Sequence, residues 1–317
     1  MVLATPIIEK LRIFFPDAQI DFLLRKGNEG LLKGHPQIHE LLVWDKKKNK
    51  RKNLFRMLMH IRKNRYDKII NVQRFFATGL LTAFSGAKQT IGFDKNPLSF
   101  LFTKKVKHMV GGEQAMHETA RNLQLVRDFT DDSNFRPKLY PSPADYSFVD
   151  TWARRKFITI SPASVWFTKQ FPGSKWISFI DHIPSGYEIY LLGGPGDRAL
   201  CKNILESCTR GKLHVLAGDL SYLQSAALMS RAVMNYVNDS APLHFASAMN
   251  APVTAVYCST IPEFGFGPVS DVQNIVEVEE KLSCRPCGLH GYSSCPLGHF
   301  RCAMDIREVQ LLKTVPL

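Results

Sequence analysis

The sequence predicts an α/β protein of two domains, with a parallel, doubly wound sheet in its second half. Short apolar segments that suit strands alternate with amphipathic segments that suit helices, and this alternation is typical of parallel sheets. Polar or glycine-rich loops follow most of the strand candidates. The length of 317 residues exceeds what a single core usually organises, so two domains are expected.

The second half alternates most regularly. Strands are predicted at 157–161, 187–192, 213–216, 233–237, 253–258 and 274–278, and helices at 175–182, 198–208, 221–230 and 243–249. In such sheets ligands bind at the carboxyl ends of the strands. Those ends carry polar or glycine-rich loops at 161–164, 193–196, 218–219, 239–240 and 259–262. Packing alone does not require five such loops on one rim.

The first half follows a looser version of the same pattern. Strands are predicted at 20–24, 41–44, 68–72 and 90–93, and helices at 1–15, 54–65, 75–84 and 117–126. The segment 131–145 contains Pro137, Pro141 and Pro143 and is predicted to be a linker, with the end of a helix at 152–156. We therefore expect one domain over 1–145 and a second over 146–317.

The stretch 233–249 is the strongest candidate for a ligand site. An apolar strand is followed by Asn238, Asp239 and Ser240, which suit a helix N-cap, and by Pro242 in the first helical turn. The free amides at a helix start favour a phosphate, whereas Asp239 beside them suits sugar hydroxyls. An ordinary capped helix would give the same pattern, so this stretch alone leaves both interpretations open.

Charge is concentrated in the first half. The net charge is +13, and residues 1–150 hold 26 Lys and Arg against 15 Asp and Glu. This balance would attract nucleic acid, anionic lipid or a phosphorylated glycolipid. No nucleic-acid-binding module or aromatic interleaving accompanies it. On the predicted helix 54–65 and the basic run before it, Lys52, Arg56, Arg62 and Lys63 belong either to a solvated face or to a contact with an anionic acceptor or membrane surface.

The sequence holds no apolar run of the roughly 20 residues that span a bilayer. Charged residues interrupt the apolar N-terminal segment early, unlike in a signal peptide. The expected location is the cytoplasm.

Four of the seven cysteines lie within nineteen residues of the tail: Cys284, Cys287, Cys295 and Cys302. A Cys-x-x-Cys pair is the usual half of a zinc site, and His290 and His299 lie nearby. Structural disulfides do not suit a reducing cytoplasm. A structural zinc ion and reduced packing thiols are both open, and catalysis through these thiols is not expected.

At several points the residues resemble the family 9 glycosyltransferases, which include the ADP-heptose:lipopolysaccharide heptosyltransferases. The similar segments in the second half are 161–172, 192–197, 238–244 and 252–262, and in the first half 3–6, 15–20, 66–71, 91–93 and 117–123. Their order matches the family over nearly the whole chain. The resemblance implies the GT-B arrangement, with two Rossmann-like domains across a cleft and the nucleotide sugar held by the second. It also implies inverting transfer of a sugar, expected to be heptose, from an ADP-sugar to the core or lipid A part of lipopolysaccharide at the inner membrane.

Carried over residue by residue, the resemblance assigns a donor site. Asp239 would hold hydroxyls of the sugar, and the backbone amides of Ser240, Ala241 and Leu243 would bind the pyrophosphate. Lys169 and Ser164 would contact the phosphates, and His244 would face them or pack at the helix start. With these groups neutralising the diphosphate, no metal cofactor is required.

Two departures from the family stand out. Ala241 occupies a position where the family usually has glycine. Family members also begin with a strand and a Gly-Asp pair immediately before the segment that matches 2–6, and that aspartate is the proposed base. The first strand of the N-terminal domain is therefore expected to be missing, and the catalytic base is unknown in this numbering. A non-catalytic protein that binds a sugar nucleotide or glycolipid is the alternative function.

Overall fold

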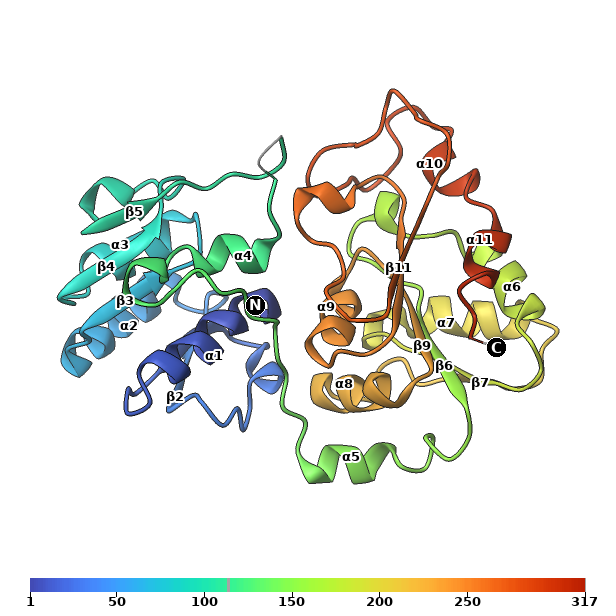
Figure 1. Ribbon diagram of the computed structural model, residues 1–317, viewed down its shortest axis with the longest axis horizontal. Coiled ribbons are helices and arrows are strands. Elements are labelled where there is room, and N and C mark those ends of the chain that lie inside the picture. The colour runs from blue at the N-terminus through green and yellow to red at the C-terminus, as the bar shows by residue number, and fades with distance from the viewer. Residues whose placement is uncertain (113–114, 317) are drawn as a thin grey trace. The chain divides into compact units, whose positions relative to one another are not determined.

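The computed structural model describes residues 1–112 and 115–316 (Figure 1). The chain forms two compact units, Met1–Pro137 and Lys138–Leu317, which we call unit 1 and unit 2. The boundary therefore falls before the predicted one at 145. Ser142 caps a helix, α5 (Pro143–Val149), through a capping box with Asp145, and α5 contacts α8 of unit 2. Pro143 occupies the first helical turn, where proline is tolerated, so it begins a helix instead of marking a linker.

Unit 2 contains a six-stranded parallel sheet in the order β11-β10-β9-β6-β7-β8. The strands are β6 (Phe157–Ser161), β7 (Glu188–Leu191), β8 (Leu213–Val215), β9 (Met234–Asn238), β10 (Val253–Tyr257) and β11 (Gln273–Glu277). Every residue of β6, β9 and β10 is buried. Strands that are covered on both faces consist almost entirely of apolar residues, so they can be predicted well from the sequence.

Helices connect these strands: α6 (Gly173–His182), α7 (Arg198–Ser207), α8 (Tyr222–Arg231) and α9 (Ala241–Ala248). Trp176 and Phe179 of α6 are fully buried against Tyr236 of β9 in the largest core cluster. The tail adds α10 (Arg301–Met304) and α11 (Glu308–Leu312), and α11 packs on α6. These two short helices were not predicted. The helix end predicted at 152–156 is wrong, because 150–152 form a turn after α5.

Unit 1 holds two separate parallel sheets. One pairs β1 (Asp21–Arg25) with β2 (Glu40–Trp44), and the other has the order β3-β4-β5, with β3 (Lys68–Asn71), β4 (Gln89–Phe93) and β5 (Lys104–Val106). The helices are α1 (Thr5–Phe14), α2 (Lys50–Asn64), α3 (Phe76–Ala83) and α4 (Glu118–Leu123). Apart from the three-residue β5, each of these elements overlaps a predicted one.

The two units differ in how their strands are joined: unit 2 has one continuous sheet, whereas unit 1 has two separate sheets. In unit 2 the first strand, β6, lies between β7 and β9. In unit 1, within residues 1–112 and 115–137, no strand pairs with both β1 and β3. Three residues in each of β1 and β3 are only half-buried. The expected absence of a first strand stays a prediction.

Short 3₁₀ turns complete the chain at Val2–Ala4, Glu29–Leu31, Ser99–Leu101, Arg127–Phe129, Phe167–Lys169, Pro195–Asp197 and Pro262–Phe264. Within residues 1–112 and 115–316, no helix combines the length and the apolar character needed to cross a membrane.

Candidate functional site

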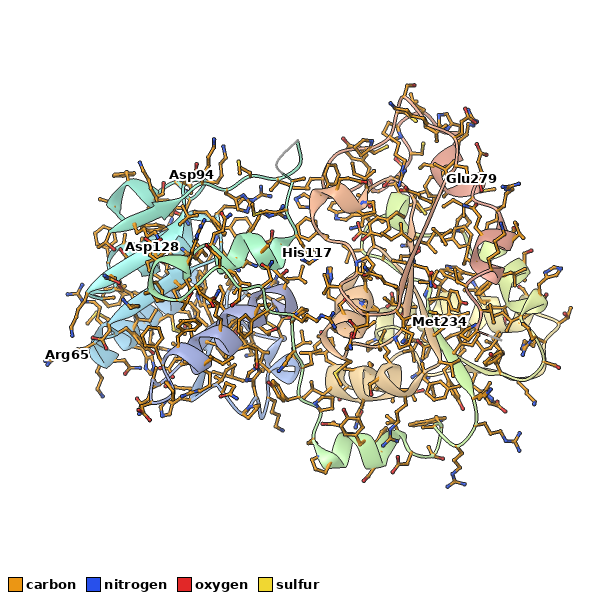
Figure 2. All side chains as sticks on the ribbon, viewed as in Figure 1. Arg65, Asp94, His117, Asp128, Met234 and Glu279 are labelled. Atoms are coloured by element: carbon orange, nitrogen blue, oxygen red, sulfur yellow. The ribbon has the colours of Figure 1, made fainter. Side chains whose placement is uncertain are left out.

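The candidate site lies where β9 ends and α9 begins. β9 starts at Met234, which Figure 2 labels within unit 2, and ends at Asn238. Ser240 is the N-cap of α9 in extended conformation, its side chain makes no capping hydrogen bond, and Pro242 lies in the first turn. Ser240 is the N-cap and Ala241 the first residue of the helix, so their amides lie where backbone donors lack partners inside the helix. This helix start can therefore offer amides and a partial positive charge to an anion.

Asn238 fixes the loops around the helix start. It is fully buried, and its amide oxygen accepts a hydrogen bond from the backbone N–H of Phe171 (2.9 Å). Its amide nitrogen donates to the carbonyl oxygen of Pro162 (2.8 Å). One side chain thereby joins the end of β9 to the loop after β6 and to the segment just after Lys169. Its loss would leave buried polar groups without partners.

Lys169 and Asp239 form an ion pair at this point, with 2.6 Å between Nζ and Oδ2. The side chains are 15% and 8% exposed, so the pair is largely shielded but still reachable. The hydroxyl of Thr260 donates to the same carboxylate oxygen of Asp239 (2.6 Å). The structure thus brings together two residues that the sequence predicts for the donor site, together with a third from the loop after β10.

Thr168, which is buried beside Lys169, is held by hydrogen bonds from two directions. Its hydroxyl oxygen accepts from the backbone N–H of Tyr292 (2.8 Å) and from the hydroxyl of Ser259 (3.0 Å). Its backbone N–H donates to the carbonyl of Tyr292 (3.1 Å), and its carbonyl accepts from the N–H of Ser259 (3.2 Å). The cysteine-rich tail is therefore attached directly to the segment that carries Lys169.

Gly291 makes this attachment close. Its φ is +76°, which favours glycine, and a Cβ added there would lie 2.9 Å from Oγ1 of Thr168 and 3.0 Å from Cγ of Lys169. A side chain at position 291 would therefore displace the segment that holds Lys169.

The other predicted donor residues occupy the same rim. Ser164 is half-buried in the loop after β6, and its carbonyl oxygen accepts from the side chain of Gln170 (2.7 Å). Ala241 is exposed, while Ser240 and His244 are half-buried. Leu243 is buried, and its amide donates to the carbonyl of Ser240 (3.2 Å). Because that bond belongs to the first turn of α9, Ser240 and Ala241 are better candidates for an anion than Leu243.

The glycine loop after β7 packs against the loop after β8. Gly218 has a φ of +83°, and a Cβ there would lie 2.9 Å from the Cα of Pro195. The N–H of Gly218 donates to the carbonyl of Gly193 (2.9 Å), and the N–H of Gly194 donates to Asp197 (2.8 Å). Close contact thus explains Gly218 and also Gly193, where an added Cβ would lie 2.7 Å from the Cβ of Asp197, whereas a Cβ at Gly196 would meet no atom within 4 Å.

Of the four tail cysteines, Cys302 lies in the core of unit 2 and Cys284 packs against it, while Cys287 and Cys295 are half-buried. Burial raises the pKa of the Cys302 thiol to about 12 and raises the pKa of Cys287 as well. Neutral thiols are poor nucleophiles and poor metal ligands until they lose their protons. Within residues 1–112 and 115–316, no group of three or more His, Cys, Asp or Glu side chains is arranged to hold a metal ion.

The candidate acceptor residues Lys52, Arg56, Arg62 and Lys63 all lie exposed on α2 in unit 1. The nitrogen Nη1 of Arg62 donates to the carbonyl of Phe84 (2.8 Å). They therefore belong to an exposed surface of unit 1.

Thr260, Thr168 and Gly291 were not assigned roles from the sequence, and Asn238 was expected only to suit a helix N-cap, a position that Ser240 occupies. Thr260 and Asn238 lie at the carboxyl ends of predicted strands, on the rim of the sheet. A polar side chain next to a buried strand was the signal that could have identified them. No such signal exists for Gly291, because its contact joins residues that are more than 120 positions apart along the chain.

Known proteins are similar to this chain in sequence over most of its length. The profile of Glycosyltransferase family 9 (heptosyltransferase) matches residues 54–291. Lipopolysaccharide heptosyltransferase 3 of Escherichia coli is 27% identical over 274 residues, covering 82% of this chain and 80% of that protein. Lipopolysaccharide core heptosyltransferase OpsX of Haemophilus influenzae is 25% identical over 304 residues, covering 90% and 83%.

Solved structures share the fold. A glycosyl transferase family 9 protein from Veillonella parvula superposes with a TM-score of 0.85 at 22% identity, covering 99% of this chain and 92% of that one. The ADP-heptose lps heptosyltransferase II of E. coli gives a TM-score of 0.78 at 20% identity, covering 99% and 93%. At these identities the likeness supports the α/β GT-B type of fold. Because the family profile spans most of the chain, this protein belongs to glycosyltransferase family 9, the heptosyltransferases.

Proposed function

We propose that this glycosyltransferase moves heptose from ADP-heptose to a lipopolysaccharide core or lipid A acceptor, with inversion at the anomeric carbon. The observation that carries the proposal is the network of Lys169, Asp239 and Thr260 at the start of α9. It joins a cation, a sugar-binding carboxylate and free helix amides on the rim of a parallel sheet, where such folds bind their ligands. The relatives named above act on lipopolysaccharide, which supports the acceptor class.

In this proposal Asp239 and Lys169 have separate roles. A carboxylate repels phosphate but accepts hydrogen bonds from sugar hydroxyls, so Asp239 binds the heptose while Thr260 holds its orientation. Lys169 turns from Asp239 to the diphosphate, and the amides of Ser240 and Ala241 bind the same group. Ser164 and His244 line the phosphate side.

The transfer exchanges one bond to the anomeric carbon for another. The acceptor oxygen attacks that carbon, the bond to the β-phosphate oxygen breaks, and ADP leaves with its negative charge. Lys169 and the helix amides stabilise this charge as it develops, which is the usual function of fixed donors in such sites. They can do so without a metal ion. The proton of the acceptor hydroxyl passes to a base, to which we assign no residue in this numbering.

The acceptor is a glycolipid, so we also propose that the protein works in the cytoplasm, peripherally bound to the inner membrane. The basic half of the chain supports this location, since anionic lipids attract Lys and Arg near the surface.

The alternative is a protein that binds sugar nucleotide or glycolipid without transferring sugar. The observation that favours it is the division of unit 1 into two sheets, which leaves the inner edges of β1 and β3 without a shared strand. Such a unit would be less able to position an acceptor.

Incubation with ADP-heptose and a lipopolysaccharide core that lacks its heptoses tests the proposal. Release of ADP and the addition of one heptose to the acceptor, both detected by mass spectrometry, are the expected results. Binding of ADP-heptose without any product would support the alternative. Failure to bind either ADP-heptose or the lipopolysaccharide acceptor would contradict both.

A further inference from the structure

Helix α2 (Lys50–Asn64) of unit 1 carries two apolar stripes, and only one of them is used in the core. Ile61 is buried, and Leu54, Met57 and Leu58 pack around it with Leu42 and Trp44 of β2. On the opposite side Phe55 is 65% exposed and Met59 is 49% exposed. Single exposed apolar residues are common, so the arrangement around these two decides what they mean.

The exposed face has a regular order. With 3.6 residues per turn, positions four apart lie on one face, so Phe55 and Met59 are neighbours. Arg51 and Arg62 fall along one side of this pair, and the other side is formed by Lys52, Arg56 and Lys63. All five cations are exposed. Two apolar side chains therefore lie between two rows of positive charge.

The charge of α2 is of one sign. Lys50–Asn64 contains six Lys and Arg and no Asp or Glu. The acidic side chains beside it are Glu40, which lies 3.7 Å from His60, and Asp45, which accepts hydrogen bonds from the amides of Lys47 and Lys48 and pairs with Lys26. Neither pairs with a cation of the exposed face. Arg62 donates a hydrogen bond to the carbonyl of Phe84.

From this geometry we infer that α2 is a membrane-surface helix that binds an anionic bilayer, with Phe55 and Met59 inserted between the lipid headgroups. The inference rests on the proposed function, which places the acceptor in a membrane, and it names the surface that meets that membrane. Cations flanking an apolar centre match a bilayer, because the lipids supply phosphate charges around an apolar interior. Nucleic acid or a soluble anion would use the cations but not an apolar centre.

Neighbouring features agree with this orientation. Figure 2 shows Arg65, the residue that ends α2, at the edge of unit 1 with its side chain directed away from the ribbon. The ring of Phe84, whose carbonyl binds Arg62, is 50% exposed. The surface therefore extends from α2 toward the end of α3.

The test measures sedimentation of the full chain with vesicles that contain no lipopolysaccharide. We expect binding to vesicles of phosphatidylcholine with phosphatidylglycerol, little binding to pure phosphatidylcholine, and weaker binding as salt rises. The double variant Phe55→Ser/Met59→Ser should lower the partition coefficient by about tenfold or more, because it removes the inserted groups but no charge. Lys52→Gln/Arg56→Gln should lower it and flatten its dependence on salt.

The matched control is Met304→Ser/Val309→Ser, which removes two side chains of 46% exposure each from helices of unit 2. It should bind vesicles like the wild type. A Phe55→Trp variant adds a direct measurement, since an inserted indole is quenched by lipids with brominated acyl chains. Circular dichroism and ADP titration confirm that each variant is folded.

Several results would overturn the inference: no binding to anionic vesicles, equal binding to neutral ones, full binding by the Phe55→Ser/Met59→Ser variant, or an unquenched tryptophan at position 55. The proposed function fails separately. A chain that binds vesicles but transfers no heptose contradicts only the transferase proposal. A chain that transfers heptose to a detergent-solubilised acceptor but binds no vesicles contradicts only the role of α2.

Discussion

At the scale of single residues, the donor site is defined by how Lys169 is held. Its ammonium group pairs with Asp239, and the adjacent Thr168 is fixed by Ser259 and Tyr292. The pair stabilises a cation in a largely shielded place and keeps it next to the helix amides. The lysine side chain is therefore already ordered, which lowers the loss of conformational entropy when it binds a phosphate.

Gly291 provides a test of this positioning. Gly291→Ala should lower the affinity for ADP by roughly tenfold or more, because the added Cβ would press on Thr168 and Lys169. The matched control is Gly288→Ala. It has a similar φ of +81°, but the nearest atom to its Cβ is the hydroxyl oxygen of Tyr292 at 3.6 Å. Calorimetric titration of both variants separates backbone strain from displacement of Lys169, and equal losses would contradict a specific role for Gly291.

The lowered pKa of Asp131 predicts that the stability of unit 1 depends on pH. Hydrogen bonds from Lys10 and Ser133 lower the pKa of this carboxyl to about 2. The pKa in an unfolded chain is about 3.9. Because the folded state favours the ionised form, the stabilisation is complete above about pH 4 and is lost as the pH falls toward 2.

Urea unfolding of wild type and Asp131→Asn at several pH values measures this effect. The wild type should be more stable at pH 6, and the difference should disappear near pH 2. Asp132→Asn serves as the control, since it removes a neighbouring carboxylate whose ion pair with Arg127 is well exposed and should contribute little. If the difference in stability between wild type and Asp131→Asn stays constant from pH 6 to pH 2, the hydrogen bonds to the ionised carboxylate are not its cause.

At the scale of elements, the sequence predicted those whose apolar pattern is long and continuous. The strands of unit 2 and helices α6 to α9 belong to this group. Asp239 was singled out because it follows the strand β9, whereas Lys169 was assigned only through the resemblance to the family 9 glycosyltransferases. β5 was missed because its three residues, Lys104, Lys105 and Val106, contain a single apolar side chain. Thr168, Thr260 and Gly291 could not be assigned, because their roles arise only where distant segments meet.

The unpaired edges of β1 and β3 give a prediction for unit 1. A strand ending in Gly-Asp, added before Met1, should pair with both edges and join the two sheets, as β6 joins β7 to β9 in unit 2. Amide hydrogens of β1 and β3 should then exchange more slowly, since open edges leave backbone groups to water. An extension of the same length made of Gly and Ser is the control. Unchanged exchange with the added strand would contradict the prediction.

At the scale of the whole molecule, the two units divide the proposed tasks. All the proposed donor residues lie in unit 2, while the basic surface and the membrane helix lie in unit 1. Residues 138–317 alone should therefore fold and bind ADP within a few-fold of the full chain. Thermal unfolding and calorimetry of the isolated unit check this, and loss of ADP binding by a folded unit 2 would place part of the donor site elsewhere.

The central claim is that the network at the start of α9 binds the donor. Titration calorimetry with ADP and ADP-heptose on wild type, Lys169→Ala and Asp239→Ala tests it most directly. Losing a charged hydrogen bond costs about 1–3 kcal/mol. Lys169→Ala should therefore weaken the binding of both ligands, whereas Asp239→Ala should weaken ADP-heptose far more than ADP, because Asp239 binds the sugar. Unchanged affinity of both variants for ADP-heptose would contradict the claim.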